Sequence, residues 1–131
     1  MQIRPYQDSD FELLTSWWTA ADVAPPPRGA IPIESTWVVI RDHEPIVSAC
    51  LLLTNIKAFA YIENLISNPA AHAEDRHQAV ELMVRYIENH ARRLGYGALA
   101  CYGRHDQLVR RYQGLGYQPA ERNLTALVKG L

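Results

Sequence analysis

AFAYIENLISNPAAHAEDRHQAVELMVRYIENHARRL, residues 58–94, is the stretch that decides the fold. Its first part, residues 58–67, is mostly apolar and ends at the turn signal Asn68-Pro69, so it predicts a buried strand. After a polar loop, apolar residues recur along one face of a long helix. These residues are Val80, Met83, Val84, Ile87, Ala91 and Leu94. The N-terminus of such a helix presents free backbone N–H groups, which suit an anion such as a phosphate.

Shorter elements flank this stretch on both sides. The expected strands cover residues 2–6, 36–41, 46–54, 98–102, 117–121 and 124–128, and the expected helices open at residues 8–10 and 105–106. In the first of these helices we expect one of Trp17 and Trp18 in the core and the other as a candidate pocket residue. The proline-rich residues 24–29 break that helix, and we interpret them as a shaped surface loop and candidate wall of a substrate groove.

Composition narrows the class of protein. The 131 residues, 48% of them apolar, fit one domain over residues 1–131 with a proper core. A net charge of -1 argues against nucleic-acid binding and membrane-surface attraction. No apolar run reaches the roughly 20 residues that span a bilayer, and the first residues lack an apolar signal region. We therefore expect a cytoplasmic protein in which Cys50 and Cys101 are reduced core thiols. The histidines and cysteines lack metal-ligand spacing.

Three segments of the chain carry a resemblance to a known family. They are residues 61–69, YIENLISNP; residues 105–117, HDQLVRRYQGLGY; and residues 3–5 together with 8–10. Their order and spacing resemble the GNAT superfamily of acetyl-CoA-dependent N-acyltransferases over nearly the whole chain. The resemblance implies an α/β (α+β) fold, with a mixed, mostly antiparallel central sheet and helices on both faces. Short proteins of this type also occur in bacteriophage genomes.

The resemblance implies transfer of an acetyl group from acetyl-CoA to an amine of a small molecule or a protein. This chemistry needs a base for the ammonium proton, donors to the thioester carbonyl and an acid for the departing thiolate. The resemblance assigns Glu63 as the base and Tyr112 as the acid. The residues alone also fit a solvent-facing or arginine-paired Glu63 and a core aromatic at Tyr112.

The resemblance also implies a set of residues that bind the cofactor. Backbone groups of Leu65 and Ser67 would bind the acetyl carbonyl and the pantetheine arm. His105 stands where the family usually has Asn, and it fits either the cofactor arm or a helix N-cap. The segment after Pro69 would hold the pyrophosphate through His72, Ala73, Asp75, Arg76, His77 and Gln78.

This pyrophosphate segment departs from the family pattern. The family positions fall on His72, Asp75 and His77, and no glycine lies between Pro69 and Gly95. Glycine lets a backbone approach phosphate closely. The carboxylate of Asp75 would repel phosphate unless it points away, whereas Arg76 and His77 carry donors that partly compensate.

Two functional classes follow from this departure. One is an active acetyltransferase, either monomeric or a homodimer. The other is a GNAT-fold protein without catalysis that serves as a binding or interaction module. A third and weaker hypothesis is an enzyme with the same fold that uses another acyl donor. The fold alone does not choose among them.

Overall fold

A five-stranded sheet forms the body of the protein, in a computed structural model that describes all 131 residues. The strands lie in chain order: β1 (Gln2–Pro5), β2 (Thr36–Arg41), β3 (Glu44–Leu52), β4 (Ala60–Ser67) and β5 (Leu99–Ala100). Neighbouring strands are antiparallel, except that β5 runs parallel to β4. The predicted mixed, mostly antiparallel sheet is confirmed.

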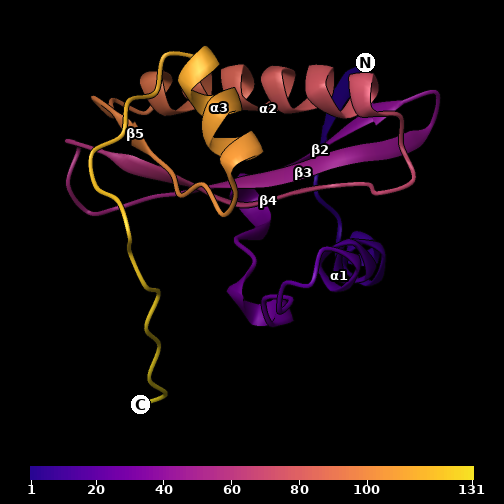
Figure 1. The fold of residues 1–131 in the computed structure, drawn as a ribbon, viewed down its shortest axis with the longest axis horizontal. Coiled ribbons are helices and arrows are strands. Elements are labelled where there is room, and N and C mark those ends of the chain that lie inside the picture. The colour runs from indigo at the N-terminus through magenta and orange to yellow at the C-terminus, as the bar shows by residue number, and fades with distance from the viewer. The chain divides into compact units, whose positions relative to one another are not determined.

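Helices cover both faces of this sheet, as the sequence predicts. α1 (Phe11–Ala20) follows the 3-10 turn η1 (Asp8–Asp10) and lies on one face, and α2 (Ala73–Arg93) lies on the other (Figure 1). The 3-10 turn η2 (Arg28–Ala30) overlaps the end of the proline-rich segment, and a further 3-10 turn, η3 (Ile33–Ser35), follows it. All of these elements belong to one compact unit, Met1–Cys101; the second unit, Tyr102–Leu131, contains α3 (Asp106–Gly114).

The hairpin of β2 and β3 is the buried centre of the sheet. Asp42 and His43 form its turn with φ angles of 48° and 69°. Two successive positive φ angles match the right-handed twist of the strands on either side. Both faces of the hairpin are mostly apolar, with Thr36 and Ser48 as buried polar residues, and Val38, Val39 and Val47 have no exposed surface. This pattern is expected where helices cover both faces of a sheet.

Each helix buries one apolar face. The buried residues of α2 are Ala79, Val80, Met83, Val84, Ile87 and Ala91, in agreement with the periodicity of the sequence; Leu94 is instead exposed. On the other face of the sheet, Trp17 and Trp18 are both buried in a cluster with Tyr6, Leu14 and Ile31. Both tryptophans are therefore core residues.

Several predicted boundaries are wrong. Residues 117–121 and 124–128 form no strands, and Leu127 and Val128 are fully exposed. Pro119 has no backbone N–H to donate to a neighbouring strand. A strand also needs a partner to pair with, and the local β-propensity of a segment does not show whether a partner exists. The strand expected over residues 98–102 shortens to Leu99–Ala100, and β4 begins at Ala60. None of the helices combines the length and apolar character needed to cross a bilayer.

Candidate functional site: strand β4 and the first turn of α2

Strand β4 contains a β-bulge. Ser48 pairs with Ile66 and Cys50 pairs with Glu63, so two steps along β3 match three steps along β4. Two β4 residues, Asn64 and Leu65, therefore face one residue of β3. Asn64 takes up the irregularity with a left-handed backbone, at a φ of 56°. Bulges of this kind bend a strand and re-aim its side chains.

The bulge decides which face of the sheet carries Glu63. Residues paired across antiparallel strands share a face, and so do alternate residues of one strand. Because Ser48 and Cys50 are alternate residues, their partners Ile66 and Glu63 lie on the same face. Ile66 packs against the cluster of α1. Glu63 therefore belongs to the α1 face of the sheet and lies opposite Cys50.

One side of β4 has a strand neighbour for only part of its length. β5 pairs with β4 at Ala60 and Tyr61 alone. From residue 62 to residue 67, the sheet continues only on the β3 side. An extended ligand can hydrogen-bond with the backbone groups of such an edge as an added strand would. Leu65 and Ser67, both partly buried, lie in this one-sided segment. The strand predicted over residues 58–67 lies inside the sheet, between β3 and β5, but within β4 only Ala60 and Ile62 are buried and the other residues are partly exposed.

The surroundings of Glu63 include a buried thiol. Burial and, as a smaller cause, the negative charge of Glu63 raise the pKa of Cys50 to about 12, although hydrogen bonds from the Glu63 backbone and from Asn64 and Thr36 oppose the rise. Cys50 is consequently an uncharged thiol at neutral pH, and the Glu63 carboxylate lies within electrostatic reach of it. Both cysteines are free; Cys50 is buried, whereas Cys101 is only partly buried.

The first turn of α2 has no side-chain cap. His72 occupies the N-cap position with extended backbone angles and caps no N–H group. Asn68 instead holds the preceding loop, because its side chain accepts from the amide of Ala70 at 2.9 Å and its carbonyl from that of Ala71 at 3.2 Å. The first helical bond runs from Arg76 N to His72 O at 3.0 Å. The amides of the first turn are therefore oriented toward an external acceptor.

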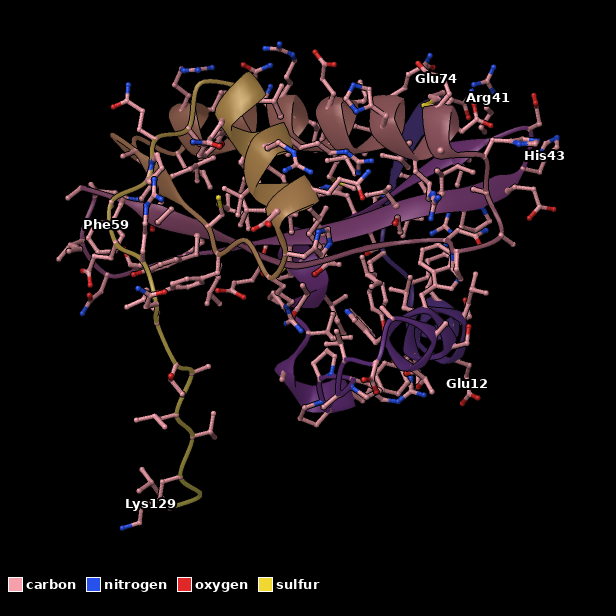
Figure 2. The ribbon with its side chains drawn as sticks, viewed as in Figure 1. Glu12, Arg41, His43, Phe59, Glu74 and Lys129 are labelled. Atoms are coloured by element: carbon pink, nitrogen blue, oxygen red, sulfur yellow. The ribbon has the colours of Figure 1, made fainter.

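Two carboxylates share this turn, and both have partners. Gln78 Nε2 donates to Glu74 Oε1 at 3.0 Å, and Arg41 Nη1 forms an ion pair with Asp75 Oδ1. Arg41 is the last residue of β2, and Figure 2 shows Arg41 and Glu74 at the same end of α2. The negative charge of Asp75 is therefore offset by an arginine. His72, Ala73 and His77 are exposed, and Arg76 is partly exposed.

The other predicted site residues lie in the second unit. His105 is the N-cap of α3, and its Nδ1 accepts from the amide of Leu108 at 3.2 Å. Tyr112 is 5% exposed and packs edge-on against Tyr117, with ring centroids 5.3 Å apart. Glu63 belongs to the first unit. The pairing of Glu63 with Tyr112 in one site therefore stays a prediction.

Sequence reasoning missed three residues near these groups. Asn64, Cys50 and Arg41 carry no motif of their own. A signal for Asn64 was present, because asparagine tolerates the left-handed conformation better than other non-glycine residues. Arg41 carries no signal, since its contact with Asp75 joins residues far apart in the chain.

Comparison with known proteins shows which solved structures share this fold. No protein-family model matches the chain, and no curated protein matches its sequence. Among solved structures, Rv2747 of Mycobacterium tuberculosis in complex with CoA matches with a TM-score of 0.75 and 14% identity, over 96% of this chain and 77% of its own. An acetyltransferase of Trypanosoma brucei matches with a TM-score of 0.74 and 14% identity, over 97% and 99%.

A third solved structure is N-acetylglutamate synthase of Neisseria gonorrhoeae complexed with CoA and L-arginine. It matches with a TM-score of 0.74 and 16% identity, over 92% of this chain and 28% of its own. At such identities the likeness concerns the fold and not the residues of the site. The chain thus has the fold of the GNAT acetyltransferases, the superfamily that its sequence resembles.

Proposed function

We propose that this protein is an N-acetyltransferase that transfers an acetyl group from acetyl-CoA to an amine of a small molecule or a protein. The observation that carries the proposal is the bulged, one-sided segment of β4, which joins a carboxylate at Glu63 to an open backbone edge. The CoA complexes of Rv2747 and of N-acetylglutamate synthase, which share the fold, support the choice of cofactor.

We assign the steps of this transfer to residues of the chain as follows. Glu63 accepts a proton from the ammonium group of the acceptor, and the neutral amine then forms a bond to the carbonyl carbon of the thioester. The backbone N–H of Leu65 donates to the carbonyl oxygen, on which negative charge develops. As the carbon–sulfur bond breaks, Tyr112 donates a proton to the departing thiolate. Backbone groups at Ser67 hold the pantetheine arm along β4.

The first turn of α2 would hold the pyrophosphate. Its uncapped amides and the positive end of the helix dipole attract anions. Arg41 offsets the charge of Asp75. Asp75 should therefore repel a bound phosphate less than the sequence suggests, although the segment has no glycine. Donors on Arg76, His77 and His72 lie on or beside this turn, next to Ala73 and Gln78.

A titration separates binding from catalysis. We expect acetyl-CoA and CoA to raise the melting temperature, because a ligand at 100 times its Kd adds about 2.7 kcal/mol to the free energy of unfolding. Thiol release with a panel of amines then tests turnover. Glu63→Gln is the matched control: it should bind acetyl-CoA as the wild type does but lose turnover, most strongly at low pH, where the acceptor amine is protonated. Absence of any thermal shift at millimolar acetyl-CoA would overturn the proposal.

A second function, a binding module without catalysis, is favoured by one observation. The first turn of α2 carries two acidic residues, Glu74 and Asp75, in a segment without glycine. In that case CoA would bind weakly or not at all, and no amine would cause thiol release. Binding of acetyl-CoA without turnover across a broad amine panel would select this function.

A further inference from the structure

Asn64 has a backbone that glycine would adopt at lower cost. Its φ of 56° lies in the left-handed region, where L side chains are disfavoured and asparagine is the best tolerated after glycine. Bulges with a left-handed first residue usually have glycine there. An asparagine at such a position is explained when its side chain makes a contact that glycine lacks.

The side chain of Asn64 makes such a contact with β3. Its Nδ2 donates to Cys50 Sγ at 3.7 Å, and Cys50 is 1% exposed. The backbone of Glu63 and the side chain of Thr36 also hydrogen-bond to this thiol. Sulfur is a weak acceptor, but several donors from β2 and β4 converge on it. The thiol thereby ties the bulge to the buried centre of the sheet.

The position of the bulge controls the orientation of Glu63, the residue just before it. If the bulge relaxed and the register slipped by one residue, the preceding side chains would change face. Glu63 would then point toward the apolar face that α2 covers, where an unpaired carboxylate is costly. Holding the bulge at Asn64 keeps Glu63 on the α1 face, opposite Cys50.

We propose that Asn64 and Cys50 form a latch across β3 and β4 that fixes the bulge and thereby positions the Glu63 carboxylate for proton transfer. Both are positioning residues, since they act through Glu63. The catalytic part of this inference rests on the proposed acetyltransferase function. The structural part, that the latch sets the surroundings of the Glu63 carboxylate, stands on the contacts themselves.

The test is a double-mutant cycle. Asn64→Gly keeps the backbone conformation and removes the amide, and Cys50→Ala removes the sulfur. We expect each to lower kcat by about 10- to 100-fold, the order of loss for a slightly misplaced catalytic group, and to shift the acidic limb of the kcat/KM pH profile. The acetyl-CoA KM should change less than kcat. The double variant should be no worse than the poorer single variant, because both changes break one contact. Cys50→Ser, which keeps an acceptor, should recover part of the rate.

The matched control is Asn123→Gly, which makes the same substitution at another left-handed asparagine, with a φ of 57° in the exposed C-terminal segment. It should leave kcat and the pH profile unchanged. A second readout needs no turnover: the Glu63 carboxyl is titrated by carbon-13 NMR in the wild type and in each variant. We expect its pKa to move in Asn64→Gly and in Cys50→Ala.

The outcomes separate the latch from the proposed function. An inactive wild type with a Glu63 titration that moves in both variants would reject the acetyltransferase and retain the latch. An unchanged Glu63 titration in both variants would overturn the latch whether or not the protein is an enzyme. Effects on kcat that multiply in the double variant would also overturn it, because the two side chains would then act independently.

Discussion

The carboxylate of Asp75, in the first turn of α2, is paired with the guanidinium of Arg41 at the end of β2. The pair joins the β2–β3 hairpin to the helix N-terminus that we propose as the pyrophosphate site. This pair bears on whether the first turn of α2, which has no glycine, can bind a phosphate. An acidic residue at this place is unfavourable for a phosphate only to the extent that its charge is exposed, and here an arginine offsets it.

The Arg41–Asp75 pair predicts two variants with opposite effects on CoA affinity. Asp75→Asn removes the negative charge and frees Arg41, so it should tighten CoA binding. Arg41→Gln leaves Asp75 without its partner and should weaken binding. Each change should amount to about 0.3–1 kcal/mol, the usual size for one charge at a helix terminus. Calorimetry at low ionic strength measures both.

Arg85→Gln serves as the control for these two variants. It breaks the exposed pair of Arg85 with Glu81 farther along α2 and should leave CoA affinity unchanged. If Asp75→Asn and Arg41→Gln both left the affinity at the wild-type value, the first turn of α2 would not be the phosphate site.

Deletion of Asn64 tests the role of the bulge in cofactor binding. The deletion leaves the pairs of Cys50 with Glu63 and of Ser48 with Ile66 in register, with Leu65 opposite the residue between them. The sheet should therefore fold. We expect acetyl-CoA affinity to fall by about 0.5–1.5 kcal/mol, the value of one hydrogen bond, because β4 no longer re-aims the backbone at Leu65. Affinity equal to that of the wild type would show that the bulge does not contact the cofactor.

The parts of the fold that sequence reasoning predicted are those with a strong local signal. The periodicity of α2 and the apolar run of β4 each follow from neighbouring residues, and both elements form where the sequence places them, apart from one or two residues at their ends. The expected strands at residues 117–121 and 124–128 failed because a strand depends on pairing with distant residues. Segments with a short apolar pattern do not reveal whether such a partner exists.

The sequence assigned residues to the candidate site only through motifs. Glu63, Leu65 and Ser67 were assigned because they lie in a strand that resembles a family strand, and their roles stay predictions. The bulge was not found, because it depends on how β4 pairs with β3. The contacts of Asn64 with Cys50 and of Arg41 with Asp75 link separate elements, and no local pattern encodes them.

The ion pair of Arg4 with Asp10 predicts a pH-dependent stability. Burial alone would raise the pKa of Asp10, but hydrogen bonds from the Arg4 side chain and the Gln7 backbone outweigh it and lower the pKa below its usual value. A carboxyl group whose pKa is lower in the folded state stabilises the fold above its unfolded pKa, near 3.9. That contribution is lost as the pH falls through the folded pKa.

Asp10→Asn should therefore reduce the free energy of unfolding at pH 7 by about 1.5–3 kcal/mol, the range for hydrogen bonds to a charged group. Near pH 2 the variant and the wild type should differ less, because Asp10 is then protonated in the unfolded state and part of its contribution to stability is lost. Urea denaturation at the two pH values measures the difference. An equal loss at both would attribute the effect to packing rather than to the charge of Asp10.

Tyr112→Phe tests the proposed general acid. The ring of Tyr112 is buried and packs against Tyr117, so phenylalanine should keep the packing and remove only the hydroxyl. If that hydroxyl donates to the departing thiolate, turnover should fall by about 10²- to 10⁴-fold, with acetyl-CoA affinity nearly unchanged. A structural tyrosine would instead lose about 1 kcal/mol of stability, from one hydrogen bond, and keep its rate.

Tyr117→Phe is the matched control, because it removes the hydroxyl of the neighbouring ring in the same edge-on pair. It should keep its turnover. Melting temperature and turnover measured on the same samples separate the two roles. Full activity of Tyr112→Phe with a reduced melting temperature would remove Tyr112 from the catalytic residues and leave Glu63 to be tested alone.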